Sequence, residues 1–247
     1  MPRLVPFRLA ATCALALVIV LSVAATAIAK GPLVDLRVVG KGGRVLAEKE
    51  ASAGPVSIKA SPRADCFGPG TGGSGENATV KAPTAMSALA GASKATASLR
   101  PLLITDAFEF GLGLCGVGGS ESTKELSWLF KVNHVAPELG GDSVKVKAGD
   151  DVLWALAPFP YPDELWLQAP RKAEPGKPFD VKVFAYDAKG KRKPAAGVTV
   201  SGASEPTDKN GVAAVVLQKP RRLIARNGED IPSNRAAVCV GGKCPGA

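Results

Sequence analysis

The sequence has very little of the residue on which most zinc sites and many catalytic sites depend. It contains one histidine among 247 residues, His134. A histidine-rich zinc site therefore cannot be assembled from this chain. His134 is also the single histidine available to activate a serine or cysteine nucleophile, and its place just after Asn133, at the end of an expected strand, favours a turn or surface position. We expect no catalytic residues, no metal site and no cofactor, and we interpret the chain as a non-enzyme.

Other motifs with a chemical role are also missing. The glycine-rich segment GLGLCGVGG, at Gly111–Gly119, has no following Lys-Ser or Lys-Thr pair, so a phosphate-binding loop is not expected. We interpret this segment as a flexible loop that carries a disulfide. The acidic pairs Asp150-Asp151 and Asp163-Glu164 lack the alternating spacing of a calcium loop. Carboxylates that meet only in the fold, as in glycoside hydrolases, leave no spacing to detect.

Charged residues are absent from a long run near the N-terminus. Leu9 to Ile28 carries no charge, follows Arg3 and Arg8, and ends in the small residues Ala27-Ile28-Ala29. This pattern predicts a secretory signal peptide at residues 1–29 with cleavage after Ala29. Because about 20 uncharged residues can also span a bilayer, an uncleaved membrane anchor remains the alternative.

Five cysteines are present, and Cys13 lies within the expected signal peptide. An even number of cysteines in an exported chain favours disulfides over metal sites. The four remaining cysteines are Cys66, Cys115, Cys239 and Cys244. They allow three pairings. We favour Cys66 with Cys115 and Cys239 with Cys244, because each bridge then stays within one of the two modules that the charge distribution suggests.

The excess positive charge is confined to the last third of the chain. Residues 30–163 contain 14 basic and 14 acidic side chains, whereas residues 164–247 contain 15 and 8. Such an asymmetry suggests two modules, of which the basic one could be attracted to an anionic envelope polymer. The candidate basic patch comprises Lys189, Lys191, Arg192, Lys193, Arg221 and Arg222. The simpler alternative is a solvated basic loop on a soluble domain.

The expected partners follow from export and from this charge pattern. A cell-envelope polymer or a surface protein is the expected class of partner. Nucleic acid is not expected, because the chain is exported and the basic run at 189–193 is not interleaved with aromatic residues. A membrane would be contacted only through an uncleaved N-terminus. The oligomeric state is left open.

Residues 30–157 form the first expected module. Alternating apolar residues predict strands near 34–38, 44–48, 56–59, 102–104, 128–132, 144–147 and 152–156. Residues 61–77 are rich in glycine, proline and polar residues and predict a long surface loop held by Cys66. One helix is expected to begin near Thr84, with Met86, Leu89 and Ala90 on the face that covers a sheet.

Within this module, the order of a hairpin, the TAMSAL helix, WLFKVNH (Trp128–His134) and VKVKAGDDVLW (Val144–Trp154) carries a resemblance. It resembles a bacterial uncharacterised domain related to the C-terminal domain of transcobalamin and intrinsic factor, over about Leu33–Leu156. The resemblance implies a β-grasp-like α+β fold, a mixed sheet that embraces one helix. It also implies a ligand-binding surface in which the matching positions are Trp128, Asn133, Asp150 and Trp154. Each of these residues also has a structural interpretation, the tryptophans as packed aromatics and the other two as turn residues.

A proline-rich segment at 158–163 is expected to be a stiff linker to a second module at 164–240, followed by a C-terminal tail at 241–247. Short strands are expected near 179–186, 198–200, 212–217, 223–226 and 236–240. Their order, together with the element TDKNGVA at Thr207–Ala213, is similar to bacterial immunoglobulin-like domains of the invasin and adhesin type. The resemblance implies a β-sandwich that acts as a spacer or an adhesive surface.

The expected fold is therefore mainly β, a β-grasp-like α+β module followed by an immunoglobulin-like β-sandwich. The expected function is that of an exported, non-enzymatic binding or presentation protein of the bacterial cell surface or envelope, similar to an adhesin. The alternative is capture of a small ligand, such as a cobalamin-like cofactor, by the first module. Adhesion predicts an exposed apolar or basic face without a deep pocket. Capture predicts a concave site lined by aromatics, and a hydrolase predicts a cleft where His134 meets a serine or a carboxylate.

Overall fold

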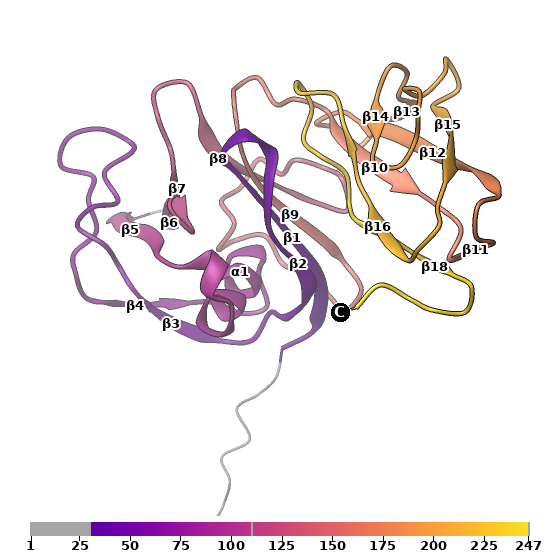
Figure 1. Ribbon diagram of the computed structural model, residues 1–247. Coiled ribbons are helices and arrows are strands. Elements are labelled where there is room, and N and C mark those ends of the chain that lie inside the picture. Colours follow the sequence, from indigo (N-terminus) through magenta and orange to yellow (C-terminus); the bar gives the residue numbers. More distant parts are fainter. Residues whose placement is uncertain (1–30, 110, 247) are drawn as a thin grey trace, which may run out of the picture.

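The computed structural model describes residues 31–109 and 111–246, and the expected signal peptide at 1–29, with Cys13, lies outside these residues. The described chain is mainly β, with several sheets and one α-helix (Figure 1). We call β1–β9 with α1 the N-terminal part and β10–β18 the C-terminal part. No helix in the described part of the chain has the length and hydrophobicity needed to cross a membrane.

The N-terminal part is built on a four-stranded sheet in the order β2-β1-β9-β8. Its strands are β1 (Leu33–Gly40), β2 (Arg44–Ser52), β8 (Ser127–Val132) and β9 (Asp151–Ala157). The central pair β1 and β9 is parallel, and the two outer pairs are antiparallel. A short 3-10 turn (Lys41–Gly43) connects β1 to β2. The strands expected at both ends of this module are therefore hydrogen-bonded neighbours in the same sheet.

One face of this sheet is covered by helix α1 (Ala85–Ala95). As expected from the sequence, Thr84 is the N-cap, and its hydroxyl accepts a hydrogen bond from the backbone N–H of Ser87 at 3.2 Å. The Ser87 hydroxyl in turn accepts from the backbone N–H of Thr84 at 3.0 Å, which completes a capping box. Met86 and Leu89 are fully buried against the sheet. The 3-10 turn η2 (Ala97–Leu99) follows the helix.

Two smaller sheets complete the N-terminal part. One pairs β3 (Val56–Lys59) with β4 (Asn77–Val80), and the other has the order β5 (Leu102–Phe108), β6 (Gly111–Val117) and β7 (Ser120–Glu121). The expected flexible loop at Gly111–Gly119 is therefore wrong, because most of it is strand β6. The reason is close packing: a Cβ at Gly113 would lie 2.5 Å from the Phe67 ring, and one at Gly116 would lie 3.0 Å from Leu103.

The expected strand at 144–147 is also absent, for a reason that its alternating pattern hides. Val146 is buried, but its backbone N–H donates to Pro83 O at 3.3 Å. The carbonyl of Val144 accepts from the N–H of Ala85 at 3.1 Å. This segment thus packs beside the start of α1 and joins no sheet. Apolar and polar residues alternate here although the segment is not a strand.

The C-terminal part consists of short strands around a second core. One sheet contains β10 (Glu164–Gln168), β12 (Pro178–Tyr186), β13 (Arg192–Pro194) and β15 (Val212–Val216). A second contains β11 (Lys172–Ala173), β18 (Ala236–Val240) and β16 (Arg221–Leu223), and β14 (Thr199–Val200) pairs with β17 (Ala225–Arg226). Strand β10 was not anticipated, although it leads from the N-terminal part into this one.

The four cysteines form the two disulfides favoured from the sequence, Cys66–Cys115 and Cys239–Cys244. The first connects the loop after β3 to strand β6, and the second closes the chain after β18. Two disulfides indicate an oxidising, extracytoplasmic environment.

The second face of the four-stranded sheet is turned toward the C-terminal part (Figure 1). Alternate residues of β1 divide between the two faces: Val38 packs in the core under α1, whereas Val39 packs in a separate cluster that includes Ile231 of the C-terminal part. Leu129, Leu153 and Ala155 belong to that same cluster. Charged side chains occupy the rest of this face, and they form the candidate site.

Candidate functional site at the junction of the two parts

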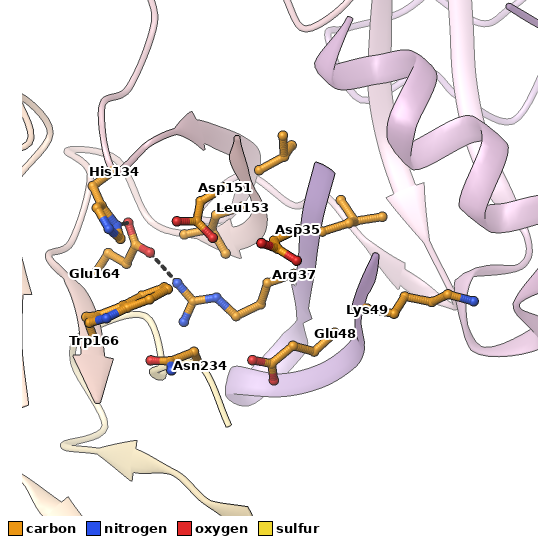
Figure 2. A pocket seen from close by; sticks show the side chains of 12 residues that line it. Asp35, Arg37, Glu48, Lys49, His134, Asp151, Leu153, Glu164, Trp166 and Asn234 are labelled. Carbon is orange, nitrogen blue, oxygen red and sulfur yellow. Dashed lines mark hydrogen bonds and ion pairs between the residues drawn. The ribbon is translucent and has the colours of Figure 1, made fainter. Parts of the chain in front are cut away.

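A cavity of about 230 Å³ lies where the second face of the sheet meets strand β10 (Figure 2). Both parts of the chain contribute to its wall. The charged and aromatic residues that matter most are Asp35, Arg37, Glu48, His134, Asp151, Glu164 and Trp166. They come from β1, β2, the turn after β8, β9 and β10. The cavity therefore exists only when the two parts are docked.

Glu164 is the centre of the charged cluster. Its side chain is 2% exposed, and its Oε1 accepts a hydrogen bond from the guanidinium of Arg37. Its Oε2 lies 3.2 Å from Nδ1 of His134 and 3.9 Å from Nζ of Lys131. Burial acts to raise the pKa of Glu164, but contact with His134 and the positive charges of Arg37 and Lys131 outweigh it, so that the pKa is lowered. Glu164 is therefore held as a carboxylate.

Arg37 extends from β1 across the junction. Its Nη1 donates to the carbonyl oxygens of Pro232 at 2.6 Å and Leu165 at 3.5 Å, in addition to the bond from Nη2 to Glu164. The guanidinium also lies 5.8 Å from the centre of the Trp166 ring. An arginine in the middle of a buried strand is thus fully engaged by the C-terminal part.

Lys131 makes the corresponding connection from β8. Its side chain is completely buried, and Nζ donates to the carbonyl oxygens of Tyr186 at 2.9 Å and Asp187 at 3.0 Å. Burial lowers the pKa of Lys131, while the negative charge of Glu164 opposes that effect. Because carbonyls and a carboxylate compensate both cations, the cluster defines the relative position of the two parts.

His134 occupies a strained backbone position that turns its ring into the junction. Asn133 and His134 have φ of 50° and 69°, and the N–H and C=O of Val132 and Val135 are mutually hydrogen-bonded around them. Positive φ at both central residues is typical of a type I′ turn. The imidazole stacks on Tyr186 with ring centres 3.8 Å apart. Its position in a turn agrees with the sequence interpretation, but that turn is packed into an interface.

The residues suggested by the family resemblance do not line this cavity. Trp154 is 2% exposed, and its indole donates to Ala85 O at 3.3 Å beneath α1. The indole of Trp128 donates to Ser120 O at 3.1 Å, and its ring packs against the same core. Both tryptophans therefore have packing roles on the face of the sheet opposite the cavity.

Asn133 and Asp150 organise a turn at one end of the sheet. The Asn133 side chain donates to Asp150 Oδ1 at 2.9 Å and accepts from the N–H of Asp151 at 3.0 Å. Asp150 Oδ2 accepts from the N–H of Lys147 at 2.9 Å. These bonds place Asp151 at the wall of the cavity.

The candidate basic residues are divided between two sheets. Lys189 and Lys191 lie in the loop between β12 and β13, where their backbone N–H groups both donate to Asp187 at 2.9 Å. Lys193 of β13 pairs with Asp163 at 2.7 Å, and this hydrogen bond raises the pKa of Lys193. Arg192 of β13 lies over the Phe184 ring, 4.5 Å from its centre. Arg221 and Arg222 belong to β16 of the other sheet.

The cavity can be tested for hydrolytic chemistry, because His134 does meet a carboxylate. Among the described residues that line it, however, none is a serine, threonine, cysteine or tyrosine. The described wall of the cavity therefore offers the pair no hydroxyl or thiol nucleophile. Within residues 31–109 and 111–246, no group of three or more histidine, cysteine or acidic side chains could hold a metal ion.

Sequence reasoning missed Arg37, Lys131, Glu164 and Trp166. A signal was present for Lys131, which is the one charged residue of the strand SWLFKV, whereas Arg37 alternates with the apolar residues of LVDLRVVG just as Asp35 does. A single charge in a strand that is otherwise apolar indicates a buried partner or an interface. No comparable signal marks Glu164 or Trp166.

No protein-family model, curated protein or solved structure matches this chain.

Proposed function

We propose that this chain is an exported, non-enzymatic binding protein that captures a small ligand in the cavity between its two parts. The observation that carries the proposal is the construction of the cavity: side chains from both parts meet there around a buried, mutually held charge cluster. Ligand sites occur preferentially at interfaces between domains and combine an apolar wall with a few fixed polar groups.

The charge cluster supports this proposal because it fixes the relative position of the two parts of the chain more than it stabilises the fold. Buried ion pairs are often no more stabilising than apolar residues of similar volume. At this junction Arg37 and Lys131 are nonetheless anchored to backbone carbonyls of the C-terminal part. The result is a rigid wall for a binding site, which limits the entropy lost when a ligand is ordered there.

The finer fold assignment belongs to the same proposal. The order β2-β1-β9-β8, with a parallel central pair and one covering helix, supports a β-grasp-like N-terminal part. The C-terminal strands around their own core support an immunoglobulin-like sandwich. A cobalamin-like ligand is less well supported, because the cavity of about 230 Å³ lies below the roughly 300–1,000 Å³ typical of drug-sized ligands.

Adhesion is supported less well by the surface. Among the described residues, the large apolar side chains that are exposed are Leu33, Phe67, Val135, Leu139, Phe159 and Val216. They come from five segments, with Val135 and Leu139 in the same one, and the basic residues lie on two sheets. Retention of the exported chain in the envelope tests this candidate directly. Arg221→Glu with Arg222→Glu should leave retention unchanged under the capture proposal, and reduced retention would favour a basic adhesive face.

The three tryptophans provide a direct test of capture. Their indole N–H signals can be followed by NMR while a library of small cationic, neutral and anionic compounds is added to the exported chain. We expect ligands to shift the Trp166 signal and to leave Trp128 and Trp154 unchanged, and Trp166→Phe identifies the signal. Shifts at Trp128 would move the site to the opposite face of the sheet. A screen that leaves Trp166 unaffected overturns the proposal.

Export itself needs a separate measurement. Cells that express the full sequence should be fractionated, and the N-terminus and free thiols of the product determined by mass spectrometry. A mature chain that starts at Lys30 and has no free thiols is the expected result. Recovery of residues 1–29 in the membrane fraction would identify an anchored protein.

A further inference from the structure

We propose that the ligand of the junction cavity is a small organic cation, bound through a primary ammonium group. This inference rests on the proposed function and adds the chemical class of the ligand. It is carried by the side chains that face the cavity and by the hydrogen-bonding capacity they leave unused.

The wall of the cavity has an excess of negative charge in a chain with formal net charge +9. Four carboxylates, Asp35, Glu48, Asp151 and Glu164, face two basic side chains. Arg37 is already bound to Glu164 and to two carbonyls, and Figure 2 shows Lys49 extending away from the other labelled charged groups. Neither cation is therefore available to an anionic ligand.

An unpaired acceptor provides a second, independent observation. Among the described residues, four buried side-chain polar atoms have no hydrogen-bond partner, and three of them belong to residues that line this cavity. They are Oε2 of Glu48, Oε2 of Glu164 and Nδ1 of His134. The last two lie 3.2 Å from each other and form an ion-pair contact, so Oε2 of Glu48 is the acceptor that remains unpaired. The Glu48 oxygen is buried, so bulk water does not solvate it freely. Carboxylate oxygens can only accept, whereas an ammonium group offers three donors and no acceptor.

The cavity also offers aromatic and apolar side chains against which the hydrocarbon part of such a ligand can pack. Trp166 presents an aromatic ring beside the cluster, and Leu153 of β9 lines the same cavity. Aromatic faces attract cations, and they pack against the carbon atoms that carry them. The Asp35 and Asp151 side chains start from neighbouring positions of the parallel pair β1 and β9. The ligand that fits is thus an alkyl- or arylammonium ion with a single charged end.

Three probes of nearly equal size distinguish charge from shape: n-butylammonium, 1-butanol and butyrate. Each is titrated into the exported chain at constant ionic strength, and the Trp166 indole signal is followed. We expect n-butylammonium to bind about tenfold more tightly than 1-butanol, as expected for hydrogen bonds between charged groups. Butyrate should leave the signal unchanged. Unchanged Trp128 and Trp154 signals verify that the fold is intact.

Two variants and a matched control locate the charge. Glu48→Gln and Asp151→Asn should each weaken n-butylammonium binding about fivefold or more, because each removes a carboxylate from the wall. Glu76→Gln removes the same charge from an exposed position just before β4, in another sheet and away from the cavity wall, and it should leave binding unchanged. An equal loss in all three variants overturns the site, because it indicates diffuse attraction by surface charge.

The outcomes separate this inference from the proposed function. Binding of 1-butanol or butyrate at Trp166 as tight as that of n-butylammonium overturns the ammonium site and leaves capture at the junction standing. A Trp166 signal that responds to another compound of the library, but to none of the three probes, does the same. A Trp166 signal that responds to no compound overturns both.

Discussion

The two faces of the four-stranded sheet are covered in different ways. Beneath α1, Leu36, Val38 and Trp154 form a continuous apolar core. Toward the C-terminal part, the intervening residues include Arg37 and Lys131 beside a smaller apolar cluster. The first face gains stability from buried apolar area, which needs no particular orientation. The second depends on directional bonds, so that it holds two parts of the chain in one geometry.

This comparison predicts that the charged face tolerates loss of one partner poorly. Glu164→Ala should lower the free energy of unfolding by about 3–5 kcal/mol, because Arg37 and Lys131 would remain buried without their counter-charge. Urea denaturation measures the change. The control Glu229→Ala removes an exposed carboxylate of the C-terminal part and should stay within about 0.5 kcal/mol of the unchanged protein. A loss below about 1 kcal/mol for Glu164→Ala would show that the junction opens to water.

The apolar face should respond to loss of volume. Leu89 is fully buried beneath α1, and Leu89→Ala should lower the free energy of unfolding by about 2–5 kcal/mol through lost burial and a residual cavity. Thermal and urea unfolding both report it. Leu139→Ala is the matched control, since that leucine is 65% exposed. Equal effects of the two variants would contradict the assignment of Leu89 to the core.

Acid should weaken the charged face before the apolar one. The pKa of Glu164 is lowered in the folded protein from its ordinary value of 4.5, so its contribution to stability is complete above pH 4.5. That contribution is lost as pH falls through the lowered value. Burial raises the pKa of Asp151 instead, and its effect has the opposite sign, favouring the folded state as pH falls.

Unfolding measured between pH 6 and pH 3, for the unchanged protein and for Glu164→Gln, isolates the first effect. The difference in stability between the two proteins should shrink on acidification. His134, Arg37, Lys131 and Asp151 face the same cluster and remain in both proteins. A difference that is constant with pH would show that Glu164 is not held as a carboxylate.

The smallest expected effect concerns the local start of α1. Thr84→Ala removes the hydroxyl that accepts from the Ser87 N–H and should lower the free energy of unfolding by about 1 kcal/mol. Thr84→Ser keeps the hydroxyl and should recover most of that loss. Chemical denaturation compares the three proteins, and no recovery with serine would assign the effect to the lost methyl group.

Much of the secondary structure followed from local patterns. Alternation located β1, β8, β9 and β12 to within a few residues, and Thr84 marked the start of α1. The pattern was wrong at Gly111–Val117, because a strand that needs glycine for close packing resembles a loop in sequence. It was also wrong at 144–147, because alternation reports burial and does not specify a hydrogen-bonded partner.

The sequence by itself determined the mainly β character of the chain, the capped helix and the four cysteines available for disulfides. These properties depend on residues that are close in the chain or on composition. Only the tertiary structure decided which charges meet. Arg37 and Glu164 are 127 residues apart, and their contact exists because β1 is central in one sheet while β10 docks on the free face of that sheet. Such a contact depends on how whole sheets pack, which no local pattern encodes.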